Sequence, residues 1–228
     1  MAETTESAPR RAAGVLPAKK RRREARIVAA ASELFAGQGY GETSIEAIAR
    51  QADVAVGTVY NYFQSKPALL MRVLTTGRSD SVSASAALVE APPDDPVEAV
   101  HRLVMAQMRG AMRHDKRLWR VIHGTAALEP EAFGREYFLG KEQFKGFIVA
   151  LLEALRDRGH FPAGADIEAA ALTIKYVASE AFRRYVVDDY PTIEDAEADL
   201  RKMIAFIIGR AAGSPARALR QASLLLFH

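Results

Sequence analysis

The chain has 228 residues, of which 49% are apolar and 26% are charged, a balance typical of a globular protein with a sizeable core. It contains no cysteine, which excludes disulfides, thiolate nucleophiles and cysteine-ligated zinc. The formal net charge is +3, and this excess lies in residues 1–66, where 10 Lys and Arg face 7 Asp and Glu. Residues 67–228 hold 21 of each sign and are neutral overall.

The basic excess is concentrated near the N-terminus, where residues 10–26 contain eight Lys or Arg and one Glu. Residues 1–19 have little apolar surface to bury, so we expect them to form a disordered basic arm. Charged residues interrupt any secretory signal, and no apolar run approaches the roughly 18 residues that span a bilayer. We therefore expect a cytoplasmic protein that does not associate with membranes.

The first expected helix covers residues 20–37 and has one apolar stripe, which ends at Gly37 and Gly39. Residues 43–63 then predict two short helices joined by a tight turn. Thr43 or Ser44 can cap the first of these, because a hydroxyl oxygen there accepts a bond from an unpaired backbone N–H.

The turn between the two short helices is expected at Asp53, where a positive φ is needed and Asp tolerates it better than most residues. In the second helix Val59 and Phe63 are four residues apart and should pack inward. Hydroxyl and amide side chains are left on the outer face, where groups that contact phosphates and base edges belong. The unit therefore fits a helix-turn-helix, with an ordinary αα-hairpin as the alternative.

These residues resemble the DNA-binding domain of TetR-type transcriptional regulators. The resemblance is carried by Glu33-Leu-Phe-Ala-Gly-Gln-Gly-Tyr40, Thr43-Ser44, Ile48-Ala49, Val54, Gly57-Thr-Val-Tyr-Asn-Tyr-Phe63 and Lys66, and it extends over about residues 23–75. Two residues depart from the family pattern. Asp53 stands where the family usually has Gly, and Glu46 stands where a basic residue is common.

The resemblance implies an all-α protein with a three-helix DNA-binding domain and a helical ligand-binding and dimerisation domain. It divides the chain into the basic arm (1–19), the helix-turn-helix domain (20–66), the C-terminal domain (67–213) and a tail (214–228). It also implies contacts to double-stranded DNA, at a palindromic operator, through Thr43, Ser44, Gly57, Thr58, Tyr60, Asn61, Tyr62 and Lys66. The family pairs its last two long helices with those of a second copy, so we expect a homodimer.

About nine helices are expected in all. After the helix-turn-helix they cover about residues 66–89, 96–113, a short stretch after Asp115, 132–158, 166–188 and 192–212, with residues 124–131 irregular. Methionine and aromatic side chains from several of them can line a pocket for an apolar small molecule, although each could equally belong to the core. The candidate ligand-binding residues are Met105, Met108, Met112, Trp119, His123, Tyr137, Phe144, Phe147, Tyr176 and Phe182.

Signs of other chemistry are weak. Glu98 and His101 have the spacing of a di-iron helix motif, but the second such pair is missing, so no metal or other cofactor is expected. No phosphate-binding glycine loop or nucleophile elbow occurs, so no enzyme is expected. The sequence predicts a DNA-binding regulator, most simply a repressor that a hydrophobic or amphipathic ligand releases from its operator. The alternative is an all-α interaction or enzyme module with a basic tail.

Overall fold

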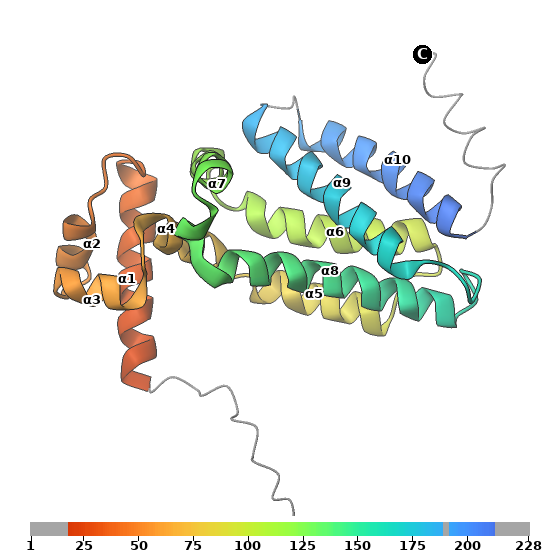
Figure 1. The fold of residues 1–228 in the computed structure, drawn as a ribbon, viewed down its shortest axis with the longest axis horizontal. Coiled ribbons are helices and arrows are strands. Elements are labelled where there is room, and N and C mark those ends of the chain that lie inside the picture. Colours follow the sequence, from red (N-terminus) through yellow and green to blue (C-terminus); the bar gives the residue numbers. More distant parts are fainter. Residues whose placement is uncertain (1–17, 189–191, 213–228) are drawn as a thin grey trace, which may run out of the picture. The chain divides into compact units, whose positions relative to one another are not determined.

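The structure is a computed structural model that describes residues 18–188 and 192–212, without the side chains of Pro130 and residues 134–138. Its regular elements in these ranges are ten α-helices and one short 3-10 helix, with no strand among them (Figure 1). The all-α prediction is confirmed, with one helix more than the nine expected. Most of the predicted arm and all of the predicted tail lie outside the described residues.

The chain divides into two compact units between Tyr62 and Phe63. The first unit contains α1 (Ala18–Gly37), α2 (Ile45–Gln51) and α3 (Val56–Tyr62). Helix α1 packs on α2, and α2 packs on α3. Each helix buries one apolar face, with side chains that include Ile27, Ala31, Phe35, Ile48 and Val59. Because α1 already begins at Ala18, the basic run from Lys19 to Arg26 is helical.

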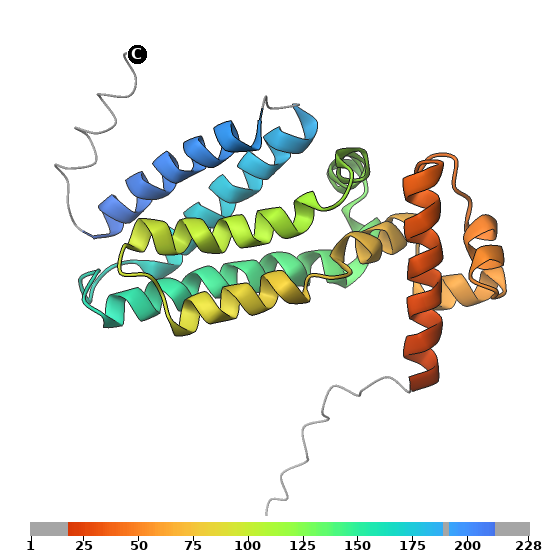
Figure 2. The same ribbon diagram turned by 180° about the vertical axis from the view of Figure 1, so that it is seen from behind.

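The second unit contains α4 (Lys66–Thr75), α5 (Ser79–Glu90), α6 (Pro96–Met112), α7 (Lys116–Leu128), η1 (Pro130–Phe133), α8 (Gly134–Asp157), α9 (Ile167–Val187) and α10 (Ile193–Ala211). Helices α5, α6, α8, α9 and α10 run alongside one another, whereas α7 is seen nearly end-on (Figures 1 and 2). The centre of their shared core includes Leu103, Val104, Ile148, Leu152, Ile174 and Ile204. This packing sets the orientation of α6, α8 and α9, and therefore which face of each helix lies outside the core.

The single helix predicted over residues 66–89 is wrong, because the structure contains two helices there. Gly77 has a φ of +80°, in the left-handed region that glycine adopts without steric cost, and it separates α4 from α5. The apolar stripe of α4 does not continue into α5, where Ser81 and Ser85 occupy buried positions. The hydroxyl of Ser85 donates to the carbonyl of Ser81 at 2.8 Å, so this buried hydroxyl has a hydrogen-bond partner within α5.

The irregular segment predicted over residues 124–131 is also shorter than expected. Helix α7 continues to Leu128, because the residues after Gly124 include two alanines, which favour helix. Pro130 then limits the backbone of the residue before it, and the chain forms the 3-10 turn η1. The longer α7 lies against both α4 and α9.

Candidate functional site

The helix-turn-helix of the first unit begins with a side-chain cap on α2. Ser44 has an extended backbone, and its hydroxyl oxygen accepts a hydrogen bond from the backbone N–H of Ala47 at 3.1 Å. Thr43, the other candidate cap, is 1% exposed, and its hydroxyl donates to the carbonyl of Gly39 at 2.7 Å. The cap is therefore Ser44, and the side chain of Thr43 holds the preceding turn rather than facing outward.

The turn between α2 and α3 is held by α1. Asp53 has a φ of +50°, as its place in the sequence predicts. The Nη2 atom of Arg26 donates to the carbonyl and to the carboxylate of Asp53, each at 3.0 Å, and also to the carbonyl of Ala52. These bonds satisfy backbone groups at the end of α2 and tie the turn to α1. The carboxylate at this position thus has a local partner, which a glycine would lack.

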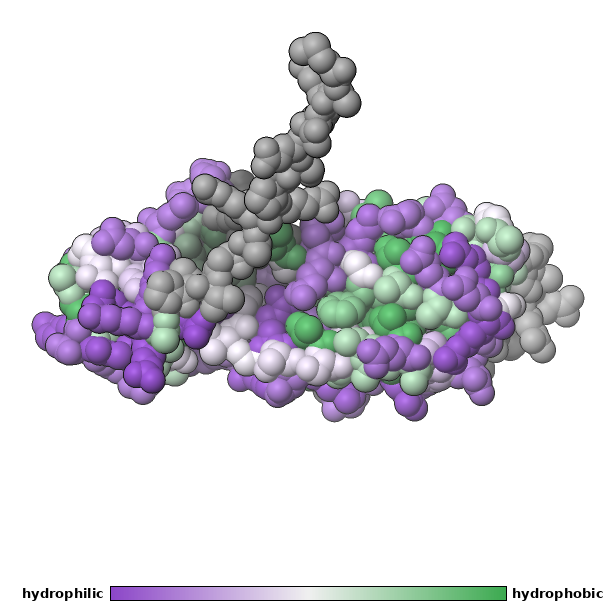
Figure 3. All heavy atoms as spheres, turned by 90° about the horizontal axis from the view of Figure 1, so that it is seen from below, coloured by the Kyte–Doolittle hydropathy of each residue, from purple (hydrophilic) through white to green (hydrophobic). Residues whose placement is uncertain are grey.

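Helix α3 turns Val59 into the core, with 0% of it exposed, and leaves its opposite side open. Tyr60 is 52% exposed, Asn61 and Gly57 are exposed, and Thr58 is half-buried. A Cβ built on Gly57 would meet nothing within 4 Å, so the start of α3 presents bare backbone. In Figure 3 hydrophilic side chains dominate the visible surface of this unit. The outward side of α3 therefore offers hydroxyls, an amide and an aromatic ring to a partner.

The last turn of α3 lies beside the start of α1. The hydroxyl of Tyr62 donates to the carbonyl of Lys20 at 3.3 Å, and the Nζ atom of Lys20 lies 5.9 Å from the centre of the Tyr62 ring. The exposed basic side chains of the first α1 turns are thus next to the end of α3. Lys66 belongs to the second unit, where it opens α4 after the capping residue Ser65.

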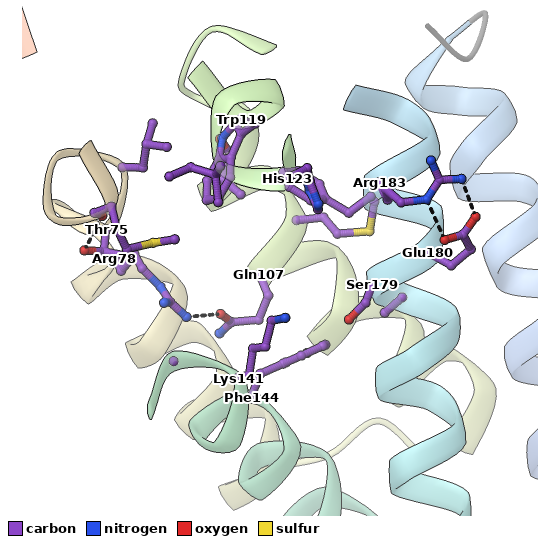
Figure 4. A pocket seen from close by; sticks show the side chains of 18 of the residues that line it. Thr75, Arg78, Gln107, Trp119, His123, Lys141, Phe144, Ser179, Glu180 and Arg183 are labelled. Carbon is purple, nitrogen blue, oxygen red and sulfur yellow. Dashed lines mark hydrogen bonds and ion pairs between the residues drawn. The ribbon is translucent and has the colours of Figure 1, made fainter. Parts of the chain in front are cut away.

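The second unit contains a pocket of about 570 Å³ whose lining comes from α4, α6, α7, α8, α9 and the α4–α5 joint (Figure 4). Six predicted ligand-binding residues line it, namely Met108, Trp119, His123, Phe144, Tyr176 and Phe182. Met105 is 3% exposed and belongs to the core, and Met112 and Phe147 pack against that core instead of lining the pocket. The side chain of Tyr137 lies outside the described part of the chain.

The aromatic side of the pocket is fixed by contacts between α6, α7 and α9. The indole N–H of Trp119 donates to the carbonyl of Ala111 at 2.8 Å, and the Trp119 ring meets Phe182 edge-on with centroids 5.2 Å apart. The ring of His123 lies 6.2 Å from that of Phe182. Met108 of α6 also lines this apolar space.

The pocket also has a polar lining, which the apolar pattern of the sequence does not predict. It includes Thr75, Arg78, Gln107, Lys141, Ser179, Glu180 and Arg183. The sequence does indicate one of these residues. Gln107 follows Leu103 by four residues and Val104 by three, so it lies on the inward stripe of α6. A polar residue on such a stripe indicates either a buried hydrogen bond or a binding site. Here Gln107 both lines the pocket and bonds to α5.

The possible metal pair Glu98 and His101 lies among arginines. Glu98 accepts a hydrogen bond from Arg102 at 2.6 Å and another from Arg201, and these bonds lower its pKa to about 2. His101 is 3.4 Å from a guanidinium nitrogen of Arg201. In the described ranges no group of three or more His, Cys, Asp or Glu could hold a metal ion. Glu98 thus forms an ionic contact between α6 and α10 through Arg201, and His101 lies beside this contact.

Burial lowers the pKa of three imidazoles, those of His101, His114 and His123. For His123 the nearby charges of Lys141 and Arg183 lower the pKa further. We therefore expect these side chains to be neutral at pH 7 in the folded protein.

We expect the free energy of unfolding to decrease as the pH falls from about 7.5 to about 5.5, because the unfolded chain then takes up histidine protons that the folded protein resists. Stability rises with pH wherever the unfolded state binds more protons, so the loss develops around the ordinary histidine pKa of 6.5. Urea-induced unfolding at the two pH values measures it. The variant His123→Gln should show a smaller pH dependence, and a wild-type stability that is equal or greater at the lower pH contradicts the expectation.

Residues 27–73 match the family model described as bacterial regulatory proteins, tetR family. This segment of the chain is therefore similar to the TetR family. It is 31% identical over 143 residues to the HTH-type transcriptional regulator EthR of Mycolicibacterium smegmatis, a match that covers 61% of this chain and 64% of that protein. It is 38% identical over 127 residues to the HTH-type transcriptional repressor KstR of Rhodococcus jostii, covering 52% and 57%. The matches thus span about three fifths of these relatives.

Solved structures share the TetR-family fold over most of this chain. The Thermus thermophilus repressor FadR, in complex with lauroyl-CoA, aligns with a TM-score of 0.66 at 24% identity and covers 81% of this chain and 93% of its own. A TetR transcriptional regulator from Rhodococcus sp. RHA1 aligns with a TM-score of 0.59 at 22% identity, covering 83% and 97%. At these identities the likeness establishes the fold alone. Among the described residues, no helix has the length and apolar character that a membrane span requires.

Proposed function

We propose that this chain is a sequence-specific DNA-binding transcriptional repressor, in the bacterial cytoplasm, which a small amphipathic ligand releases from its operator. One observation carries the proposal, namely the α2–turn–α3 unit whose third helix leaves Tyr60 and Asn61 exposed within the residues that match the tetR family model. The names of the relatives EthR and KstR, which are a regulator and a repressor, support it.

In this proposal α3 enters the major groove, and its exposed face carries Thr58, Tyr60 and Asn61 to the base edges and phosphates. Gly57 allows the backbone to approach closely, and the capped N-terminus of α2 at Ser44 faces a phosphate. Tyr62 and Lys66 add phosphate contacts as the resemblance implies. The side chain of Thr43 is buried, so we assign it no direct DNA contact.

The basic residues before and on α1 are proposed to add affinity without sequence preference. Deleting residues 1–17 removes Arg10 and Arg11 and leaves α1 intact. We expect weaker DNA binding and a salt dependence shallower by up to about 0.9 in log-log slope for each phosphate that the protein no longer neutralises. Substituting glutamine for Lys19, Arg22 and Arg23 is the matched comparison within α1. Binding titrations at several salt concentrations measure both slopes, and unchanged slopes would remove these residues from the interface.

The operator is proposed to be palindromic because the protein is proposed to act as a homodimer through α9 and α10. These helices expose apolar side chains, including Leu172, Tyr176, Met203 and Phe206, each between 37% and 63% exposed. Ile204 and Ile207, which the apolar pattern alone would place in the seam, instead face the core of their own chain. Exposed apolar side chains on two adjacent helices suit a surface that a second copy covers.

Ligand release requires that the ligand favour one arrangement of the protein over another. Met71, Leu74 and Thr75 of α4 line the pocket, and α4 starts four residues after α3 ends. A ligand that shifts α4 could therefore alter the spacing of two recognition helices, which must match successive major grooves about 34–36 Å apart. The FadR structure in complex with lauroyl-CoA supports an amphipathic effector for a protein of this fold.

A reporter gene under the promoter beside this gene tests the proposal in cells. Deleting the gene should raise expression of the reporter, and reintroducing it should restore repression. A fall in expression on deletion would indicate an activator, and no change would argue against action at that promoter. No feature of the described residues favours the alternative of an enzyme or interaction module.

A further inference from the structure

Arg78 is a cation of the pocket lining for which the described residues supply no charge partner. It lies at the joint between α4 and α5, next to Gly77, and its side chain is half-buried in the pocket lining (Figure 4). Its guanidinium donates to the amide oxygen of Gln107 at 3.3 Å, and no carboxylate of the described residues is within ion-pair distance of it. Burial lowers the pKa of Arg78, yet arginine keeps its charge in proteins at neutral pH.

The partner of Arg78 is held in one orientation. The amide nitrogen of Gln107 donates to the hydroxyl of Ser85 at 2.8 Å and to the carbonyl of Ser81 at 3.2 Å, so its oxygen is directed to Arg78. On the other side α8 passes closely, because a Cβ added to Gly140 would lie 3.0 Å from a guanidinium nitrogen of Arg78. Three elements thus position a half-buried cation, and its hydrogen-bond partner among the described residues, Gln107, is neutral.

The other end of the pocket is already neutralised. Arg183 donates to both carboxylate oxygens of Glu180, at 2.8 and 2.7 Å, and also pairs with Asp188 at 3.2 Å. Between these two ends the lining is mainly apolar, with Met108, Trp119 and Phe144. An ionised group in such a space needs a charge partner to offset the loss of water, and Arg78 can provide it.

We propose that the effector is an amphipathic carboxylate whose head group binds Arg78 while its hydrocarbon part lies among Met108, Trp119, Phe144 and Phe182. This rests on the proposed function, because it names the chemical class of the proposed effector. An anion at Arg78 would contact the joint that follows α4, and it would therefore act on the helix that links the pocket to the DNA-binding unit along the chain.

The test is a titration of the full-length protein, without DNA, with dodecanoate, the neutral dodecan-1-ol and lauroyl-CoA. Trp119 is the only tryptophan, so its fluorescence reports on the pocket, and calorimetry gives an independent affinity. The variants are Arg78→Met, which removes the cation, and Gln107→Glu, which places a competing carboxylate beside it. Arg109→Met on α6 removes an exposed cation outside the pocket and is the matched control. Circular dichroism checks that each variant is folded.

We expect dodecanoate to bind the wild type and Arg109→Met equally and to bind both pocket variants about 10- to 100-fold more weakly, as the loss of a charged hydrogen bond predicts. Dodecan-1-ol should bind all four proteins with a similar, weaker affinity. The proposal is overturned if the alcohol binds the wild type as tightly as dodecanoate, or if folded Arg78→Met keeps its affinity for dodecanoate. Binding of lauroyl-CoA without binding of dodecanoate also overturns it. A failure to bind DNA leaves these outcomes unaffected and counts against the proposed function alone.

Discussion

Replacing Tyr60 with alanine is expected to abolish operator binding at protein concentrations where the wild type is saturated. Tyr60 is 52% exposed on α3, so its loss should leave the fold intact. Removing a base contact costs about 1–3 kcal/mol, and a symmetric dimer is affected in both half-sites, which gives about 2–6 kcal/mol in total. Fluorescence anisotropy with labelled operator DNA measures the affinity.

The variant Tyr60→Phe separates the two parts of this side chain. If the hydroxyl makes the contact, Tyr60→Phe should lose most of the affinity that Tyr60→Ala loses. If the ring packs against the sugar or a thymine methyl, Tyr60→Phe should bind nearly as well as the wild type. Tyr60→Ala with wild-type thermal stability and unchanged operator affinity would remove Tyr60 from the interface.

Placing charges on the exposed face of α10 is expected to convert the protein to a monomer. Met203 and Phe206 are 46% and 49% exposed, and we propose that a second copy covers them. Central apolar contacts of an interface cost about 2 kcal/mol or more each when they are removed, and a buried unpaired carboxylate adds to that cost. The double variant Met203→Glu, Phe206→Glu should therefore sediment as a monomer at micromolar concentration, where we expect the wild type to sediment as a dimer.

Leu128→Glu is the matched control for the dimer interface. Leu128 is 83% exposed at the end of α7, so the same change from an apolar to a charged side chain there should leave the dimer intact. The Met203, Phe206 double variant should also lose operator affinity, because a monomer reads only one half-site. A monomeric wild type, or a double variant that stays dimeric, would contradict the proposed interface.

Local chemistry made the helix-turn-helix predictable from sequence. The positive φ at Asp53 could be predicted because only a tight turn fits between the two short helices. The cap on α2 could be predicted because a hydroxyl side chain directly precedes its apolar stripe. The choice between Thr43 and Ser44 could not be made from sequence, because both carry a hydroxyl. It depends on the carbonyl of Gly39, which the turn brings to within 2.7 Å of the Thr43 hydroxyl.

The second unit was harder to predict, because apolar periodicity does not say which neighbour covers each face. Met105 and Met108 are both buried in the core on the inward side of α6, yet only Met108 also lines the pocket. Ile204 on α10 shows the same ambiguity, since it is 0% exposed within its own chain. Arg78 gave no signal in sequence, because its position depends on the break at Gly77 and on contacts from α6 and α8.

Selection from a pool of random-sequence duplex DNA with the purified full-length protein decides whether this chain reads DNA sequence as a symmetric pair. We expect rounds of selection in the presence of competitor DNA to enrich a two-fold symmetric sequence. Its half-sites should lie about one helical turn, or a multiple of it, apart, since two copies of α3 must enter successive major grooves on one side of the duplex. Tyr60→Ala should enrich no sequence. Recovery of DNA without any common motif, together with an affinity that depends on salt concentration but not on DNA sequence, would contradict sequence-specific recognition by this chain.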